Sequence, residues 1–232
     1  MVGLTTGVIY TDKLDFEIEL NLRDSQLTVA TTNGQSLHID LHGQNPSGPA
    51  REVFEFLVKC GISTELTNPV SATQSASVDF PNYSAGHAKS LAEAIGGITA
   101  SLESFRADLR EETSPIQLWP HQFDLAMLWL PGEKITDQDP ADEESSDKHM
   151  NFGFTFGDQG IPEPYFYITA YPAEGTFATH VLPDGVQWHT EGFTGAVLLY
   201  RQLLTEANPY EFLIDFWKSL LVVGKSSLTA NS

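Results

Sequence analysis

The segment "QFDLAMLWL", residues 122–130, limits the possible folds more than any other part of the chain. An extended strand turns successive side chains to opposite faces, so both faces of this segment would be mostly apolar. One face would carry Phe123, Leu125, Met127 and Trp129, and the other Asp124, Ala126, Leu128 and Leu130. Such a strand is stable in the middle of a sheet that is covered on both sides. The segment therefore predicts a central strand.

Asp124 is the polar exception at the beginning of this strand. A buried, ionised carboxylate needs a cation or several hydrogen-bond donors, and otherwise it takes up a proton. One interpretation is a structural aspartate that is bonded to backbone amides or to an arginine, and it is the more common outcome. Arg106, Arg110 and Arg201 are candidates for that arginine. The other interpretation is a catalytic aspartate. We expect Asp124 to be buried in either case.

Periodicity along the rest of the chain predicts the fold class. Alternating apolar and polar residues over 14–42 predict three antiparallel strands, with Asn33-Gly34 as a hairpin turn. Further strands are predicted over 151–156 and 165–171. Helical spacing predicts three main helices, over residues 45–62, 84–112 and 208–226. Runs of strands between helices indicate an α+β protein, with antiparallel sheet or sheets on which the three helices pack.

The length of the chain is that of one large domain or two small ones. We expect residues 1–232 to form a single α+β domain. An alternative is two similar halves, about 1–112 and 113–232, because each contains strands followed by a helix. Segment 133–148 holds seven acids, two lysines and almost no apolar residues. We predict that it is a mobile acidic loop without fixed contacts.

Charge and cysteine content exclude several classes of partner and of site. The formal net charge is -19, from 31 acidic and 12 basic residues, which argues against nucleic acid and against anionic membranes. No apolar run approaches the roughly 18 residues of a membrane span, and the first residues do not resemble a signal peptide. The single cysteine, Cys60, rules out an intramolecular disulfide and a cysteine-based zinc site. We therefore expect a soluble, cytoplasmic protein whose oligomeric state the sequence does not indicate.

The segment "FGDQGIPEPYFYITAYP" combines a turn with an aromatic strand. Asp158 lies in a turn framed by two glycines, and Glu163 lies between two prolines that hold it extended. A stiffly held acid can present a base or bind a ligand oxygen, although a solvent-exposed turn is about as common. The next strand places Tyr165, Tyr167 and Tyr171 on one face. Such a row suits a ligand pocket, but a core layer with hydroxyls at its edge is the more common outcome.

The segment "QWHTEG" places His189 and Glu191 two residues apart, on one face of an extended chain. This spacing suits an acid–base pair or two metal ligands, with a third ligand from Glu163, His149 or His121. An exposed turn is the more common outcome for each residue alone. The chain has no HExxH, Walker A, GxSxG or GxGxxG motif, so we predict no defined metal site and identify no cofactor.

Two sets of candidate residues follow from these patterns. The candidate catalytic residues are Asp124, Glu163, His189 and Glu191. The candidate ligand-binding residues are Trp119, His121, Asp158, Tyr165, Tyr167 and Trp188.

Three segments together resemble a widespread bacterial family, the domain-of-unknown-function 5996 family. They are "SPIQLWPHQFDLAMLW", "NFGFTFGDQGIPEPYFYITAYP" and "WHTEGFTGAVLLY", and the early "GLTTG" resembles the same family. The resemblance covers nearly all of the chain, and its most specific parts are "WPHQFDLA" and "GIPEPYFY". It implies characteristic residues at Trp119, Phe123, Asp124, Glu163, Pro164, Tyr167 and Glu191.

The resemblance implies no activity. It also implies that some tens of residues usually precede "GLTTG", so we expect an N-terminal segment to be missing here. Family members can have glycine where His121 stands, which weakens a catalytic role for this histidine. Three hypotheses remain: a protein that binds a small molecule in an aromatic and acidic pocket, a metal-assisted hydrolase, and a protein-interaction module without a ligand.

Overall fold

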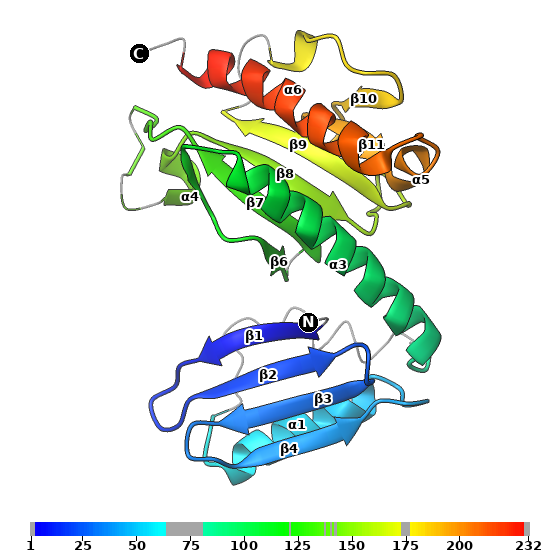
Figure 1. Cartoon of the computed structure of the whole chain (residues 1–232). Helices are drawn as coiled ribbons and strands as arrows, with labels where there is room; N and C mark the ends of the chain where they lie inside the picture. The colour runs from blue at the N-terminus through cyan, green and yellow to red at the C-terminus, as the bar shows by residue number, and fades with distance from the viewer. Residues whose placement is uncertain are drawn as a thin grey trace. The chain divides into compact units, whose positions relative to one another are not determined.

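Two antiparallel sheets contain the named strands of the computed structural model (Figure 1). The structure describes residues 3–63, 81–120, 122–136, 138–139, 141, 143–172 and 177–229. The chain divides into two units, Met1–Gly96 and Gly97–Ser232. The predicted α+β class, with antiparallel sheets and three main helices, is confirmed.

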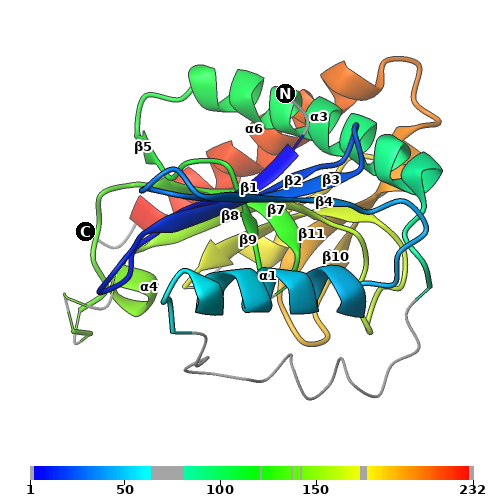
Figure 2. The same ribbon diagram turned by 90° about the horizontal axis from the view of Figure 1, so that it is seen from below.

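The first unit contains a four-stranded sheet in the order β1-β2-β3-β4. Its strands are β1 (Gly3–Ile9), β2 (Phe16–Asn21), β3 (Gln26–Thr31) and β4 (Ser36–Asp40), and helix α1 spans Ser47–Lys59. Figure 2 shows α1 along one face of this sheet, where Val53 and Leu57 join a buried cluster with Val29 and Ile39. The sequence pattern predicted β2, β3 and β4. It did not predict β1, whose pairing with β2 is interrupted by a bulge between Thr5 and Val8.

The second unit contains a seven-stranded sheet in the order β10-β11-β9-β8-β7-β5, with β6 also paired to β7. Its strands are β5 (Glu112–Thr113), β6 (Gln117–Trp119), β7 (Asp124–Leu130), β8 (His149–Thr155), β9 (Tyr165–Tyr171), β10 (Val186–His189) and β11 (Gly195–Leu199). The helices are α3 (Ala85–Ala107), α4 (Glu143–Ser146), η1 (Phe177–Thr179), α5 (Tyr200–Leu203) and α6 (Pro209–Thr229), and the boundary between the units falls within α3. Strand β7 has partners on both sides, as predicted for a central strand.

One face of the seven-stranded sheet packs against aromatic side chains of α3 and α6. The ring of Phe105 in α3 lies 4.9 Å from that of Phe152 in β8 and 5.4 Å from that of Trp217 in α6. Trp217 also contacts Phe166 of β9, with 6.1 Å between the ring centroids. All four side chains are at most 1% exposed. This face therefore forms the apolar core of the second unit.

The opposite face of the same sheet is polar over its middle strands. Strand pairing aligns His189, Gly195, Thr169 and Asn151 in one row across β10, β11, β9 and β8. Directly paired residues project from the same face of a sheet. A neighbouring row contains Val197, Tyr167 and Gly153. This face holds the candidate site.

The acidic segment 133–148 makes contacts at both of its ends. Lys134 forms a β-bridge and an ion pair with Asp147, at 2.7 Å from Nζ to Oδ1. Lys148 binds Glu133 at 2.7 Å and also donates to the main-chain oxygen of Leu228 in α6 at 2.8 Å. The prediction that the segment has no fixed contacts is therefore wrong at its ends, where both of its lysines form ion pairs. Its mobility stays a prediction.

Replacing residues 137–142 by a short glycine linker should change the melting temperature by less than about 2 °C, because the contacts at both ends are kept. Changing Lys148 to methionine should lower it by more, since Lys148 is 15% exposed and joins this segment to α6. Differential scanning calorimetry of both variants tests the two expectations. A larger loss for the linker variant than for the methionine variant would contradict them.

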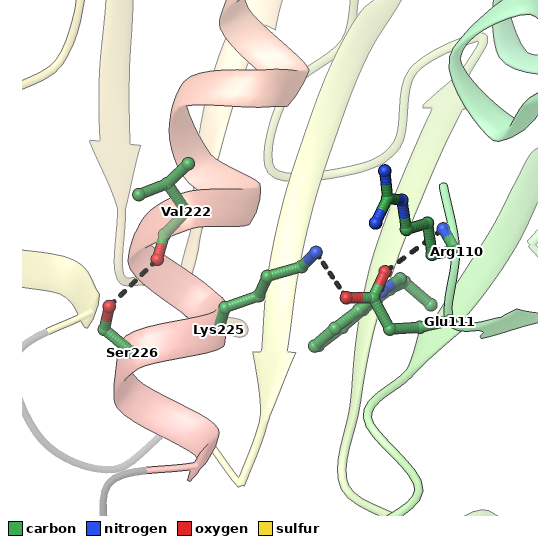
Figure 3. Close-up of polar contacts among 6 residues, drawn as sticks. Arg110, Glu111, Val222, Lys225 and Ser226 are labelled. Atoms are coloured by element: carbon green, nitrogen blue, oxygen red, sulfur yellow. Dashed lines mark hydrogen bonds and ion pairs between the residues drawn. The ribbon is translucent and has the colours of Figure 1, made fainter. Parts of the chain in front are cut away.

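A polar cluster joins α6 to the sheet edge. Figure 3 shows Lys225 of α6 pointing to Glu111, and Trp129 of β7 contacts both residues. Lys225 Nζ lies 2.6 Å from Glu111 Oε1 and 5.4 Å from the centre of the Trp129 ring. The indole nitrogen of Trp129 donates to Glu111 Oε2 at 3.3 Å. The hydrogen bond from Lys225 is the main cause that lowers the pKa of Glu111 from 4.5 to about 2.

A lowered pKa means that the ionised carboxylate stabilises the folded state. This contribution is present above pH 4.5 and is lost as the pH falls through about 2. Since about a third of each partner is exposed, we expect Glu111→Gln to cost only about 0.5–1 kcal/mol at neutral pH. Urea melts at neutral pH and at low pH should show a difference from wild type that shrinks in acid. An equal difference at both pH values would contradict this account.

Among the described residues, no helix combines the length and the apolar character that a membrane span requires.

Candidate functional site

An open cavity of about 720 Å³ lies on the polar face of the seven-stranded sheet. Strands β7, β8, β9 and β10 and the loops that follow β8 and β10 provide its lining. Six of the candidate residues meet there: Asp124, Asp158, Tyr165, Tyr167, His189 and Glu191. They lie up to 67 positions apart in the sequence (191 minus 124) and are brought together by the strand order.

Asp124 and Tyr167 form the most buried polar pair of the cavity. Asp124 is 7% exposed, and its Oδ2 accepts a hydrogen bond from the Tyr167 hydroxyl. Asn151 Nδ2 lies 3.5 Å from the same hydroxyl oxygen and donates to it. Burial, and then the hydrogen bond to Asp124, raise the pKa of Tyr167 above its ordinary value. Tyr167 therefore remains a protonated hydrogen-bond donor at neutral pH.

Two acceptors in this cluster have no partner among the residues that the structure describes. They are Oδ1 of Asp124 and Oδ1 of Asn151, and both atoms are buried. The interpretation of Asp124 as a residue held by backbone amides or an arginine is not supported, because its carboxylate is bonded to Tyr167. Arg106 binds Glu103 instead, and Arg201 binds Glu163.

Gly153 is what allows Tyr167 to reach Asp124. The two residues are directly paired between β8 and β9, and the tyrosine ring lies over the glycine. A Cβ atom at position 153 would lie 2.3 Å from Cζ of Tyr167 and 2.4 Å from its hydroxyl oxygen. Real Cβ atoms do not approach other atoms so closely, so the side chain of any other residue would displace the ring.

A tight turn places Asp124 at the beginning of β7. The amide of Phe123 donates to the main-chain oxygen of Trp119 at 2.8 Å, which closes the turn between β6 and β7. Phe123 has a φ of 55°, a left-handed conformation that is uncommon for a bulky residue. The strand begins at Asp124 and not at Gln122 as predicted, because Gln122 and Phe123 belong to this turn.

Asp158 and Tyr165 form a second acid–tyrosine pair. Asp158 Oδ1 accepts from the amides of Gly160 and Ile161, at 2.7 and 2.8 Å, and Oδ2 lies 2.5 Å from the Tyr165 hydroxyl. The hydrogen bond from Tyr165 lowers the pKa of Asp158, and the two amides and the nearby His189 add to the effect. Asp158 is therefore ionised at neutral pH. Burial, and then Asp158, raise the pKa of Tyr165.

His189 and Glu191 line the cavity, but they do not form the predicted acid–base pair. His189 Nε2 lies 2.6 Å from the main-chain oxygen of Glu191, so it must be the protonated nitrogen that donates. The imidazole also lies against Phe193, with 4.6 Å between the ring centroids. The chain turns after His189, at the end of β10, so this arrangement does not support an acid–base pair between the two side chains.

The other candidates lie elsewhere. Glu163 is not in the cavity lining and binds Arg201, at 2.6 Å from Nε to Oε2. Trp188 is paired with Ala196 on the helix-covered face, and its indole nitrogen donates to the main-chain oxygen of His180, so it cannot line this cavity. Trp119 is paired with Asp124 but is not part of the lining. His121 lies outside the described residues.

Sequence reasoning did not identify several residues of the lining. They are Gln122, Asn151, Thr155, Gln159 and Phe193. The signal for two of them was present: the alternation that placed Phe152 and Phe154 in the core also places Asn151 and Thr155 on the opposite face.

A metal centre finds little support in the geometry. Among the described residues, no three side chains of histidine, cysteine, aspartate or glutamate lie close enough together to hold a metal ion. His149 was considered as a third ligand, but its Nδ1 donates to the main-chain oxygen of Asp147 at 2.9 Å. Its ring stacks on Tyr171, with 5.2 Å between the ring centroids.

Comparison with protein families finds a match over nearly the whole chain. The model described as "Family of unknown function (DUF5996)" matches residues 1–227. No curated protein and no solved structure matches the chain.

Proposed function

The chain belongs to DUF5996, a family of unknown function, and we propose that it is a small-molecule-binding protein whose ligand occupies the cavity beside Asp124 and Tyr167. The open cavity on the polar face of the sheet is the observation that carries this proposal. Its volume of about 720 Å³ falls within the range of about 300–1,000 Å³ that is usual for ligand pockets.

The lining has the mixed character of a binding site. The aromatic rings of Tyr165, Tyr167 and Phe193 offer apolar surface, while the paired acids and amides offer fixed polar groups. Fixed polar groups in an otherwise apolar wall orient a ligand and select it. The pairing of each tyrosine with an acid also holds both side chains in place before a ligand arrives.

The charges of the lining favour a neutral or positively charged ligand. Asp124, Asp158 and Glu191 supply carboxyl groups, and no lysine or arginine is among the lining residues. An anion would lack a cationic partner there. We further propose that nucleic acid is not a partner, since the chain has a formal net charge of -19.

A metal-assisted hydrolase is less well supported. Its proposed acid, Glu163, is bound to Arg201 outside the cavity, and His189 is bonded to a main-chain oxygen. Of the described residues considered for metal binding, His189 and Glu191 line the cavity, but Glu163 and His149 do not.

A cavity-filling variant tests the proposal. Thr169→Trp should block the cavity, because Thr169 projects into it between Asn151 and Gly195. Val222→Trp is the matched control, since Val222 is 66% exposed on α6. We expect a fragment set screened by ligand-observed NMR to contain compounds that bind wild type and Val222→Trp but not Thr169→Trp. If the folded Thr169→Trp variant binds every fragment that wild type binds, the cavity is not the site.

A further inference from the structure

We propose that the ligand is an organic cation with a primary ammonium or amidinium group, and that Asp124 and Asn151 bind this group. The inference rests on the proposed function, because it assigns the chemistry of the same cavity. It is based on acceptors that the protein leaves unsatisfied.

Asp124 presents the first of these acceptors. This residue is 93% buried (100 minus 7% exposed) and lines the cavity. Oδ2 accepts from Tyr167, but Oδ1 has no hydrogen-bond partner within the described part of the chain. Leaving a buried acceptor without a donor is costly, so a donor from a ligand would stabilise it.

Asn151 presents the second acceptor beside the same hydroxyl. Its Nδ2 points to Tyr167, and its Oδ1 is buried without a partner in the described residues. The only proton of the Tyr167 hydroxyl is donated to Asp124. This part of the wall therefore presents two acceptor oxygens that have no partner among the described residues. A primary ammonium has three N–H donors and an amidinium has several, so either can satisfy both oxygens.

The surrounding charges favour a cation over a neutral donor. Asp158 is ionised, and its oxygens already accept from Tyr165, Gly160 and Ile161, so it contributes negative potential without needing the ligand's hydrogens. Glu191 adds another carboxyl group. A cation near several carboxylates in a partly enclosed cavity is attracted more strongly than in water. The faces of Tyr167 and Phe193 can receive the apolar part of the ligand.

The burial of Asp124 Oδ1 limits the size of the cationic group. A narrow N–H donor can enter such a space with a small adjustment of the wall. A quaternary ammonium is wider and has no N–H to donate, so it satisfies neither oxygen. This difference between the two kinds of cation distinguishes binding through N–H donors from binding through positive charge alone.

Four probes that share a benzyl or phenyl body test the inference at neutral pH: benzylammonium, benzyltrimethylammonium, benzyl alcohol and benzoate. Their dissociation constants can be measured by ligand-observed NMR up to about 10 mM. We expect benzylammonium to bind wild type about 10-fold or more tightly than the trimethyl and alcohol probes, and benzoate not to bind. Binding of benzylammonium should be lost in Thr169→Trp.

Two substitutions assign the contacts. Asp124→Asn should weaken benzylammonium about 10-fold or more and leave benzyl alcohol nearly unchanged. Asn151→Ala keeps the carboxylate and should weaken benzylammonium by a smaller factor, which provides a test if the first variant folds poorly. Asp12→Asn, an exposed carboxylate of the first unit, is the control for charge alone.

The outcomes separate this inference from the proposed function. If benzyl alcohol or the trimethyl probe binds as tightly as benzylammonium, and Thr169→Trp abolishes that binding, the cavity is a site but its ligand is not an N–H cation. If benzylammonium does not bind up to about 10 mM, or binds Asp124→Asn and Asn151→Ala as wild type, the inference is overturned. If Thr169→Trp alters the binding of none of the probes, the inference is overturned, and the fragment screen decides the proposed function.

Discussion

Replacing Gly153 by alanine is expected to destabilise the protein by about 3 kcal/mol or more and to remove ligand binding. The new Cβ would lie 2.3 Å from Cζ of Tyr167, so the ring has to leave its place over β8. Its hydroxyl then no longer reaches Asp124, and a buried carboxylate loses its donor. Overpacking and an unpaired buried charge therefore add together.

Urea melts measure this loss, and a second glycine in the same chain provides the control. Gly96 lies in α3 with no atom within 4 Å of an added Cβ, so Gly96→Ala should stabilise the protein by about 0.5–1 kcal/mol. In the double variant Gly153→Ala/Tyr167→Ala the clash is absent. Its destabilisation should be smaller than the sum of the two single effects by more than about 1 kcal/mol. Additive effects would mean that the tyrosine ring does not depend on the glycine.

Replacing Asp124 has the second largest expected effect, and its two substitutions should differ. Asp124→Ala leaves the Tyr167 hydroxyl without its acceptor and opens a gap, at a cost of about 1–3 kcal/mol. Asp124→Asn keeps an acceptor oxygen for the Tyr167 hydroxyl. It removes a carboxylate whose other oxygen has no partner among the described residues. We expect its free energy of unfolding to stay within about 1 kcal/mol of wild type.

The comparison separates a structural role of Asp124 from a binding role. A stable Asp124→Asn variant that no longer binds benzylammonium would assign its charge to the ligand. A loss of stability as large as that of Asp124→Ala would instead assign the charge to the fold. Urea melts of the three proteins, together with NMR binding to the same samples, distinguish these results.

The local pattern of apolar and polar residues was sufficient to predict much of the fold. Alternation predicted β2, β3 and β4, and helical spacing predicted the three main helices to within a few residues. The apolar run of β7 correctly indicated a central strand, with Asp124 buried at its beginning. These features depend on residues that are close in sequence, because the periods of the strand and the helix decide which side chains share a face.

The cavity could be predicted only in part. Alternation placed Tyr165, Tyr167 and Tyr171 on one face, but of these three tyrosines Tyr171 is not part of the cavity lining. Asp124, Asp158 and Glu191 line the cavity beside the other two. The partners within that space were not predictable from spacing. Asp124 is bonded to a tyrosine 43 residues away, while Glu163 is bonded to Arg201 outside the cavity.

Tertiary structure decided these pairings through the order and register of the strands. Alternation along β10 places Trp188 and His189 on opposite faces, and the register of β10 on β11 decides that His189 is the one that faces the cavity. The space over Gly153 exists only because β8 is paired with β9 at Tyr167. A one-residue change of register would move every side chain of a strand to the other face. The sequence by itself therefore determined which side chains alternate along each strand. Only the assembled sheet determined which donor meets which acceptor, because that choice depends on contacts between residues far apart in the chain.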